Sequence, residues 1–188
     1  GQILTPVKWK FEIEKVTDTE FKLKYIANVD KGWTVYSQYT SDDGPVPTSV
    51  NYDAMEGIQL IGKATESGSK KEGMDAYFGV NVIKFLADKP FIIEQRIKVK
   101  DASKPIIGYV NFMACDHEKC LPPSDAEFSF KIPQDGVSNV KTGTTPTPTA
   151  AATAQTEMPK DAESLPGSST APAVSADTTK TELSASSV

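Results

Sequence analysis

Apolar and polar residues alternate in two segments near the beginning of the chain. In residues 7–16 apolar side chains alternate with lysines and glutamates, and residues 21–29 begin with the same alternation. A period of two is typical of a strand that is buried on one face. The sequence therefore predicts two strands here, joined as a hairpin through a turn at Asp18.

Further short apolar segments follow, separated by turn-forming residues. No segment has the apolar period of a helix, and the Gly-, Ser- and Lys-rich residues 63–78 are assigned no strand. About nine short strands at this spacing predict an all-β domain, and we favour an immunoglobulin-like β-sandwich over a barrel. The additional strands are expected at 32–36, 48–53, 57–62, 79–87, 90–99, 105–114 and 126–132.

The composition changes close to Pro133. Residues 1–136 contain every Trp, Tyr and Phe of the chain, whereas residues 137–188 are dominated by Thr, Ser, Ala and Pro. A segment of that kind cannot bury enough apolar surface to offset the entropy lost on ordering. We therefore expect a folded domain over residues 1–136 and a disordered, flexible linker over 137–188. A linker in that place suggests a piece of a longer protein.

Charge and hydropathy exclude two classes of protein. The net charge of -5 argues against a nucleic-acid-binding protein, which would present a basic surface. No apolar run approaches the roughly 20 residues that a membrane-spanning helix requires. Any membrane contact is therefore expected only through a parent protein.

The segment from Gly108 to Pro123 holds both cysteines, Cys115 and Cys120, and the single histidine, His117. A close pair suggests a disulfide and an oxidising compartment. One hypothesis is a purely structural disulfide, although so short a ring would constrain the unfolded chain by only about 2 kcal/mol. A second is a zinc or copper site with His117, although the spacing matches no standard zinc motif. Both hypotheses stay open.

The third hypothesis is a redox-active pair, which exchanges disulfides through thiolate attack. His117 and Lys119 would favour a thiolate, while the acidic residues at 116 and 118 would oppose it, so we expect no strongly lowered thiol pKa. Cys115 ends an apolar strand and is expected to be covered. Cys120 precedes two prolines, which cannot donate to a central strand, and is expected to be exposed.

Three short segments are each a weak signal but are more specific when they occur together in this order. In an all-β chain with a Ser/Thr/Pro-rich tail, they resemble the N-terminal periplasmic domain of the DsbD-type thiol–disulfide interchange proteins. The resemblance spans about residues 5–133. The segments are Gly32-Trp33-Thr34-Val35-Tyr36, Asp75-Ala76-Tyr77-Phe78-Gly79, and Cys120-Leu121-Pro122-Pro123 preceded by Cys115.

The resemblance implies a protein-disulfide reductase domain in the periplasm, part of an inner-membrane protein. It implies an immunoglobulin-like sandwich, monomeric and without metal or cofactor, that takes electrons from a thioredoxin-like domain of the same polypeptide. Electrons would pass to periplasmic disulfide isomerases or to thioredoxins of cytochrome c maturation, with the linker as a tether. The implied site has Cys115 and Cys120 as catalytic residues, surrounded by Asp75, Tyr77, Phe78, Tyr36 and His117.

The chain departs from this family at several positions. The loop between the cysteines is one residue shorter, Ala76 replaces an acidic residue, and Tyr77 and Thr34 replace a Phe and a Tyr. Residues 75–79 are similar to the family's cap loop, which shields the cysteines. The differences concern the contacts of this loop and the choice of partner more than the exchange chemistry. Two alternatives stay open: an extracytoplasmic β-sandwich binding module with an inert disulfide, and a Cys/His metal carrier.

Overall fold

The structure is a computed structural model that describes residues 3–134. Over these residues the chain forms eleven strands and no helix. The described residues therefore contain no apolar helix long enough to cross a membrane. The predicted linker at 137–188 lies outside the described residues. The strands are β1 (Val7–Lys15), β2 (Glu20–Val29), β3 (Thr34–Tyr36), β4 (Ser49–Ala54), β5 (Ile58–Ser67), β6 (Ser69–Asp75), β7 (Val80–Leu86), β8 (Phe91–Val99), β9 (Ile106–Phe112), β10 (Ala114–Cys115) and β11 (Ser124–Phe130).

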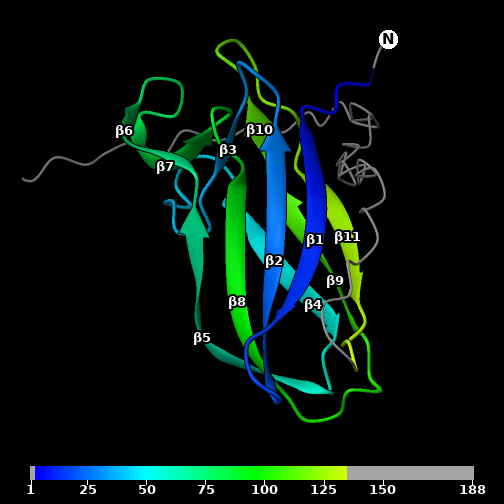
Figure 1. Ribbon diagram of the computed structural model, residues 1–188. Coiled ribbons are helices and arrows are strands. Elements are labelled where there is room, and N and C mark those ends of the chain that lie inside the picture. Colours follow the sequence, from blue (N-terminus) through cyan, green and yellow to red (C-terminus); the bar gives the residue numbers. More distant parts are fainter. Residues whose placement is uncertain (1–2, 135–188) are drawn as a thin grey trace, which may run out of the picture. The chain divides into compact units, whose positions relative to one another are not determined.

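The strands form three antiparallel sheets. The alternating segments pair as predicted, with β1 and β2 in register from Val7↔Val29 to Lys15↔Phe21. They belong to a sheet of order β1-β2-β8-β5, and a second sheet has the order β11-β9-β4. Figure 1 shows these two sheets facing one another as a sandwich. The all-β, immunoglobulin-like prediction is confirmed.

The core lies between the two facing sheets and is rich in aromatic rings. The ring of Phe128 on β11 lies 5.1 Å from that of Tyr25 on β2 and 5.6 Å from that of Phe11 on β1. The Tyr25 hydroxyl reaches across to the hydroxyl of Tyr52 on β4, at 3.0 Å. Full burial of one such side chain is worth about 1.5–3 kcal/mol, so the alternating apolar positions supply the main stabilisation.

The second sheet requires a glycine at its centre. Gly108 on β9 lies opposite Tyr52 and Phe128 in the two neighbouring strands. A Cβ atom at this position would lie 1.9 Å from the backbone oxygen of Asn51 and 2.8 Å from the Phe128 ring. Only glycine allows β4 and β9 to approach this closely.

The prediction for residues 63–78 was wrong, because two strands occupy most of this segment. β5 continues to Ser67 after a bulge between Ile61 and Thr65. The buried amide of Gln95 donates to the carbonyl oxygens of Ile61 and Gly62, at 3.2 and 3.3 Å, which compensates for the interrupted ladder. β6 follows, with its five central residues exposed, so it shows no alternation in the sequence.

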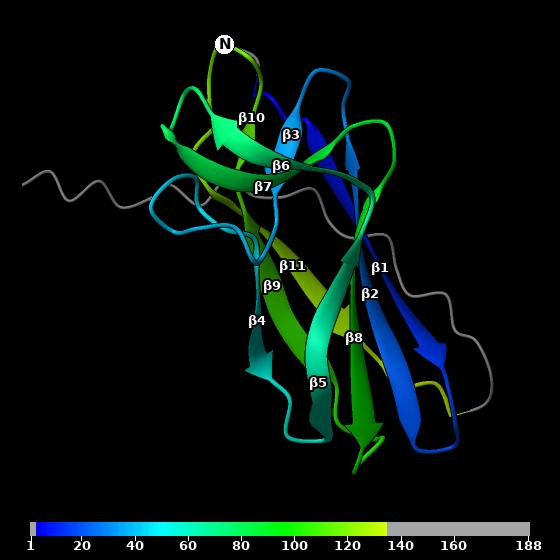
Figure 2. The same cartoon turned by 90° about the vertical axis from the view of Figure 1, so that its left-hand side faces the viewer.

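The third sheet, of order β10-β3-β7-β6, lies at one end of the sandwich. Figure 2 shows the β6–β7 hairpin running across this end, over the short strands β3 and β10. The hairpin, β3 and β10 carry parts of the three segments that the sequence singled out. This small sheet therefore brings together segments that are far apart in the sequence.

Truncation after Gln134 is expected to leave the melting temperature unchanged within about 2 °C. The composition of residues 137–188 gives them little apolar surface to pack, and a loss of 1 kcal/mol would move the transition by about 4 to 8 °C in a small domain. Differential scanning calorimetry of the full chain and the truncated chain measures this. A larger decrease would mean that residues 137–188 stabilise the sandwich.

Candidate active site

Cys115 and Cys120 form a disulfide at the end of the molecule that carries the small sheet. Their sulfur atoms are 2.07 Å apart and their Cα atoms 4.0 Å apart. Cys115 ends β10, where it pairs with Thr34 on β3, and the Thr34 hydroxyl donates to its carbonyl oxygen at 3.2 Å. Cys120 returns beside it through an isolated antiparallel bridge. The loop between the cysteines is therefore a tight reversal at the rim of the sandwich.

The loop between the cysteines has hydrogen bonds of its own. The Asp116 carboxylate accepts the N–H groups of Glu118 and Lys119, at 2.8 and 2.7 Å. These two bonds hold the pKa of Asp116 below its usual range. Beyond the loop, the N–H of Leu121 donates to the carbonyl oxygen of Ala114 at 2.9 Å. The reversal is thus supported by bonds other than the disulfide.

The two cysteines differ in exposure in the order that was predicted. Cys115 is 4% exposed and packs in a small cluster with Tyr36, Val82 and Met113. Cys120 is half-buried and packs at the edge of the same cluster. Cys120 is thus the more accessible residue of the pair, but it is not fully exposed as the sequence had led us to expect.

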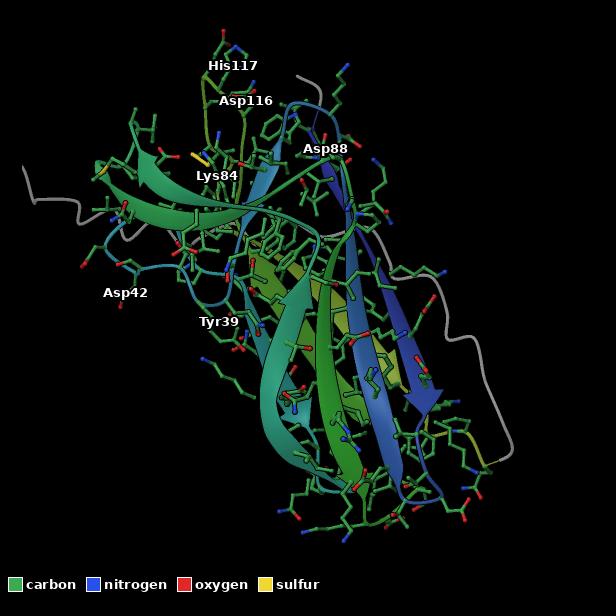
Figure 3. All side chains as sticks on the ribbon, turned by 60° about the vertical axis from the view of Figure 1, so that its left-hand side comes forward. Tyr39, Asp42, Lys84, Asp88, Asp116 and His117 are labelled. Carbon is green, nitrogen blue, oxygen red and sulfur yellow. A yellow bond between two sulfur atoms is a disulfide. The ribbon has the colours of Figure 1, made fainter. Side chains whose placement is uncertain are left out.

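His117 lies at the outer tip of the loop (Figure 3), and its side chain is 84% exposed. Its Nε2 atom is 3.4 Å from the carboxylate of Glu118, which is also exposed. The side chain thus points away from the disulfide, although the residue lines the mouth of the cleft described below. No group of three or more metal-binding residues is found among residues 3–134, and both sulfurs are bonded to each other.

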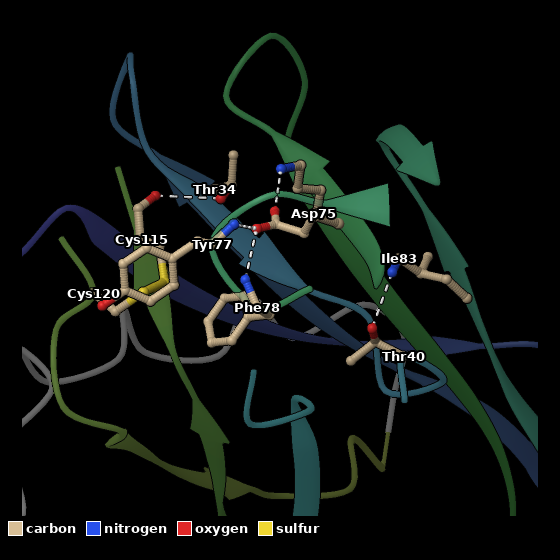
Figure 4. Close-up of polar contacts among 9 residues, drawn as sticks. Thr34, Thr40, Asp75, Tyr77, Phe78, Ile83, Cys115 and Cys120 are labelled. Carbon is tan, nitrogen blue, oxygen red and sulfur yellow. Dashed lines mark hydrogen bonds and ion pairs between the residues drawn. A yellow bond between two sulfur atoms is a disulfide. The ribbon is translucent and has the colours of Figure 1, made fainter. Parts of the chain in front are cut away.

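A second loop, the cap loop (residues 75–79), connects β6 to β7. The Asp75 carboxylate folds this loop by accepting the N–H of Tyr77 at 2.9 Å and the N–H of Phe78 at 3.4 Å. The N–H of Gly79 donates to the Asp75 carbonyl oxygen at 2.7 Å, and Gly79 has a positive φ of 70 that favours glycine. Figure 4 shows both side-chain bonds.

The two aromatic residues of the cap loop point in different directions. Phe78 packs edge-on against the buried Tyr36, with ring centroids 6.0 Å apart. Tyr77 is 68% exposed and contacts the Phe78 ring at 5.0 Å. In Figure 4 the Tyr77 ring is projected onto the disulfide. Phe78 therefore anchors the loop, while Tyr77 lies at its surface.

A cleft of about 420 Å³ is lined by both the cap loop and the disulfide. It brings together the motifs that the sequence singled out, and its lining also includes Lys84 on β7, which sequence reasoning missed. The only signal for Lys84 was a cation within the apolar segment of β7. The lining includes Tyr36, Asp75, Tyr77, Lys84, Cys115 and Cys120.

The contacts of the Asp75 carboxylate determine its protonation state. The Lys84 ammonium lies 2.9 Å from the Asp75 carboxylate, and this bond, with those from the Tyr77 and Phe78 N–H groups, holds the pKa of Asp75 below its usual range. Burial, together with the negative charge of Asp75, raises the pKa of the Tyr36 hydroxyl. At neutral pH Asp75 is therefore ionised and cannot act as a proton donor.

Comparisons with known proteins found likenesses of fold only. No family model matches the chain, and no curated protein matches it. The N-terminal periplasmic domain of ScsB from Proteus mirabilis is 16% identical, with a TM-score of 0.48, over 66% of this chain and 45% of that chain. The GAE domain of yeast GGA1 is 9% identical, with a TM-score of 0.42, over 69% of this chain and 94% of that chain.

Proposed function

We propose that this domain is a thiol–disulfide exchange relay. The observation that carries the proposal is a disulfide between a buried and a half-buried cysteine, in a cleft that an aromatic loop also lines. In the oxidised state Cys115–Cys120 accepts two electrons and two protons from a dithiol partner, which becomes a disulfide. The reduced domain then returns them to an oxidised partner.

A purely structural role fits the disulfide less well. Its short ring constrains the unfolded chain by only about 2 kcal/mol. The loop that it closes already has the two hydrogen bonds to Asp116 and the bond from Leu121 to Ala114. The reversal therefore has its own support when the disulfide is open, as a reversible site requires.

The difference in exposure between the two cysteines suggests the order of the exchange steps. A partner thiolate attacks the sulfur of Cys120, which forms the mixed disulfide and releases Cys115 as a thiolate. The partner's second thiolate then attacks the sulfur of the partner's first cysteine in the mixed disulfide, and Cys120 leaves as a thiolate. In the reverse direction Cys120 attacks an oxidised partner and Cys115 resolves the intermediate.

The partners follow from the family resemblance of the sequence. We infer thioredoxin-like domains on both sides: one in the same polypeptide as the donor, and a periplasmic disulfide isomerase or a thioredoxin of cytochrome c maturation as the acceptor. The domain would then be a monomeric, periplasmic part of an inner-membrane protein. Residues 137–188 would tether it within reach of both partners.

The proposal predicts that a reduced thioredoxin-like protein reduces the disulfide much faster than glutathione does, because we expect the cap loop to hinder the approach of small thiols. Tyr77→Ala is expected to raise the glutathione rate about fivefold, the equivalent of about 1 kcal/mol of lost cover. Thiol alkylation at timed intervals, followed by mass spectrometry, measures both rates.

Tyr39→Ala serves as the matched control, because Tyr39 is an exposed tyrosine outside the cleft. It should leave the glutathione rate unchanged. An equal rate for Tyr77→Ala and wild type, with the fold intact, would reject the cap. Failure of the thioredoxin-like protein to reduce the wild type would reject the relay and favour a binding module with an inert disulfide.

A further inference from the structure

Lys84 occupies an electrostatically unfavourable position in the small sheet. On β7 it lies between Tyr36 of β3 and Lys71 of β6, which are its cross-strand partners. Like charges directly opposite one another in a sheet are destabilising. The Lys84 side chain is only 23% exposed, so its charge requires a nearby anion.

That anion is Asp75, the residue that folds the cap loop. One carboxylate oxygen of Asp75 accepts from the Lys84 ammonium at 2.9 Å, and the side chain is 11% exposed. The other oxygen accepts the N–H groups of Tyr77 and Phe78. A single carboxylate thus links the cap loop to β7, whose Lys84 lines the cleft.

We propose that Lys84 is a positioning residue that holds the cap loop closed over the Cys115–Cys120 disulfide by fixing Asp75. The inference rests on the proposed function, since closing the cap has a role only where the disulfide exchanges. In this proposal Lys84 acts through the carboxylate of Asp75, and the carboxylate acts through the backbone of the loop.

The charges around the pair define how the closed state responds to pH. Besides Lys84, the cleft is lined by titratable groups of the other elements: Lys71 and Glu72 on β6, Tyr36 on β3, Tyr77 in the cap loop, and Asp116, His117 and Lys119 in the loop between the cysteines. The exposed side chain of His117 lies beside Glu118, away from the pair. The pKa of Asp75 is held below its usual range, so its carboxylate stays ionised between pH 5 and 8.

The sign of the pH effect follows from the lowered pKa of Asp75. When the cap opens, the carboxyl returns toward its ordinary value of 3.8. The contribution of the pair to closure is therefore fully present above that value and is lost as the pH falls through the lowered value. Mild acidification between pH 5 and 8 therefore leaves this contribution to closure unchanged.

The test uses the full chain and tris(2-carboxyethyl)phosphine, a small reductant. At each pH, the rate at which this reductant reduces the protein is divided by the rate at which it reduces a short peptide. The peptide comprises residues 113–122 and contains the same disulfide without the cap loop. Lys84→Met is expected to raise this ratio about fivefold or more at pH 7, and Lys84→Arg should restore it. The reductant is anionic, so loss of a cation by itself would slow the reaction.

Lys71→Met is the matched control, because Lys71 is a second lysine of the same cleft and lies directly opposite Lys84. It should not accelerate reduction. The wild-type ratio should stay flat from pH 5 to 8 and rise below about pH 4, while Asp75→Asn should be fast and lack this rise. Amide hydrogen exchange at Tyr77 and Phe78 should speed up in Lys84→Met while the amides of β1 and β2 stay protected, which separates local opening from unfolding.

The inference would be overturned if Lys84→Met had the same ratio of protein rate to peptide rate as the wild type and amide exchange in its cap loop were unchanged. Acceleration by Lys71→Met as large as that by Lys84→Met would also overturn it. The outcome does not depend on the relay itself. If Lys84→Met is reduced faster but the wild type does not exchange with thioredoxin-like proteins, the role of Lys84 stands and the proposed function is rejected. If the wild type exchanges but Lys84→Met is not reduced faster, the proposed function stands and the role of Lys84 is rejected.

Discussion

A Cys115→Ala variant should capture a thioredoxin-like partner as a stable mixed disulfide through Cys120, and a Cys120→Ala variant should capture little. The partner keeps only its attacking cysteine, which is first coupled to thionitrobenzoate. When a domain thiolate displaces thionitrobenzoate, the coloured anion is released and the mixed disulfide remains. The release rate and the gel shift of the adduct measure the capture.

The expected difference comes from the environment of the two sulfurs. Cys115 is 4% exposed, ends a strand and packs against Tyr36 and Met113. Cys120 is half-buried and lines the cleft in which a partner's sulfur would approach. Because exchange requires an in-line approach to sulfur, we expect Cys120 to react at least about tenfold faster, which corresponds to about 1.4 kcal/mol of activation free energy.

Denaturing urea provides the control for intrinsic reactivity. Unfolded Cys115→Ala and Cys120→Ala proteins should react at similar rates, because the difference in cover is then lost. Faster capture through Cys115 in the folded protein would reverse the assignment of the two cysteines. Capture by neither folded variant would contradict the relay.

The sandwich could be predicted from the sequence because its core strands have one buried face. In β1 and β2 the alternation of apolar and charged residues fixes both the strand and the buried side. β6 could not be found in this way, since its central residues are exposed on both faces and carry no period. The continuation of β5 beyond its bulge was hidden for a different reason: it depends on the Gln95 side chain, from another strand.

The candidate site could be predicted only as a set of motifs. The sequence brought forward Cys115, Cys120 and the aromatic cap loop, and the covered position of Cys115 followed from its place at a strand end. Lys84 could not be connected to Asp75, because their contact depends on the β6–β7 hairpin, one strand of which was missed. The outward position of His117 likewise depends on the turn that Asp116 folds, which a lone histidine in a sequence does not indicate.

The reduction potential of Cys115–Cys120 is the second large effect that the proposal predicts. An exchange-active disulfide must lie within the range of thioredoxin-like proteins, about -270 to -120 mV, whereas stable structural disulfides lie below about -300 mV. A difference of about 30 mV is a tenfold change in the equilibrium constant for two electrons. The two interpretations therefore differ severalfold or more in the fraction reduced at a chosen potential.

The most direct test of the relay is a redox titration of the full chain in glutathione buffers. A catalytic amount of a thioredoxin-like protein is added so that the cap does not prevent equilibrium. Alkylation of the thiols and mass spectrometry give the reduced fraction at each potential. The proposal predicts a reversible two-electron transition above about -300 mV. A disulfide that stays oxidised down to that potential, in the folded protein and with the mediator present, would contradict the relay and leave a β-sandwich with an inert disulfide.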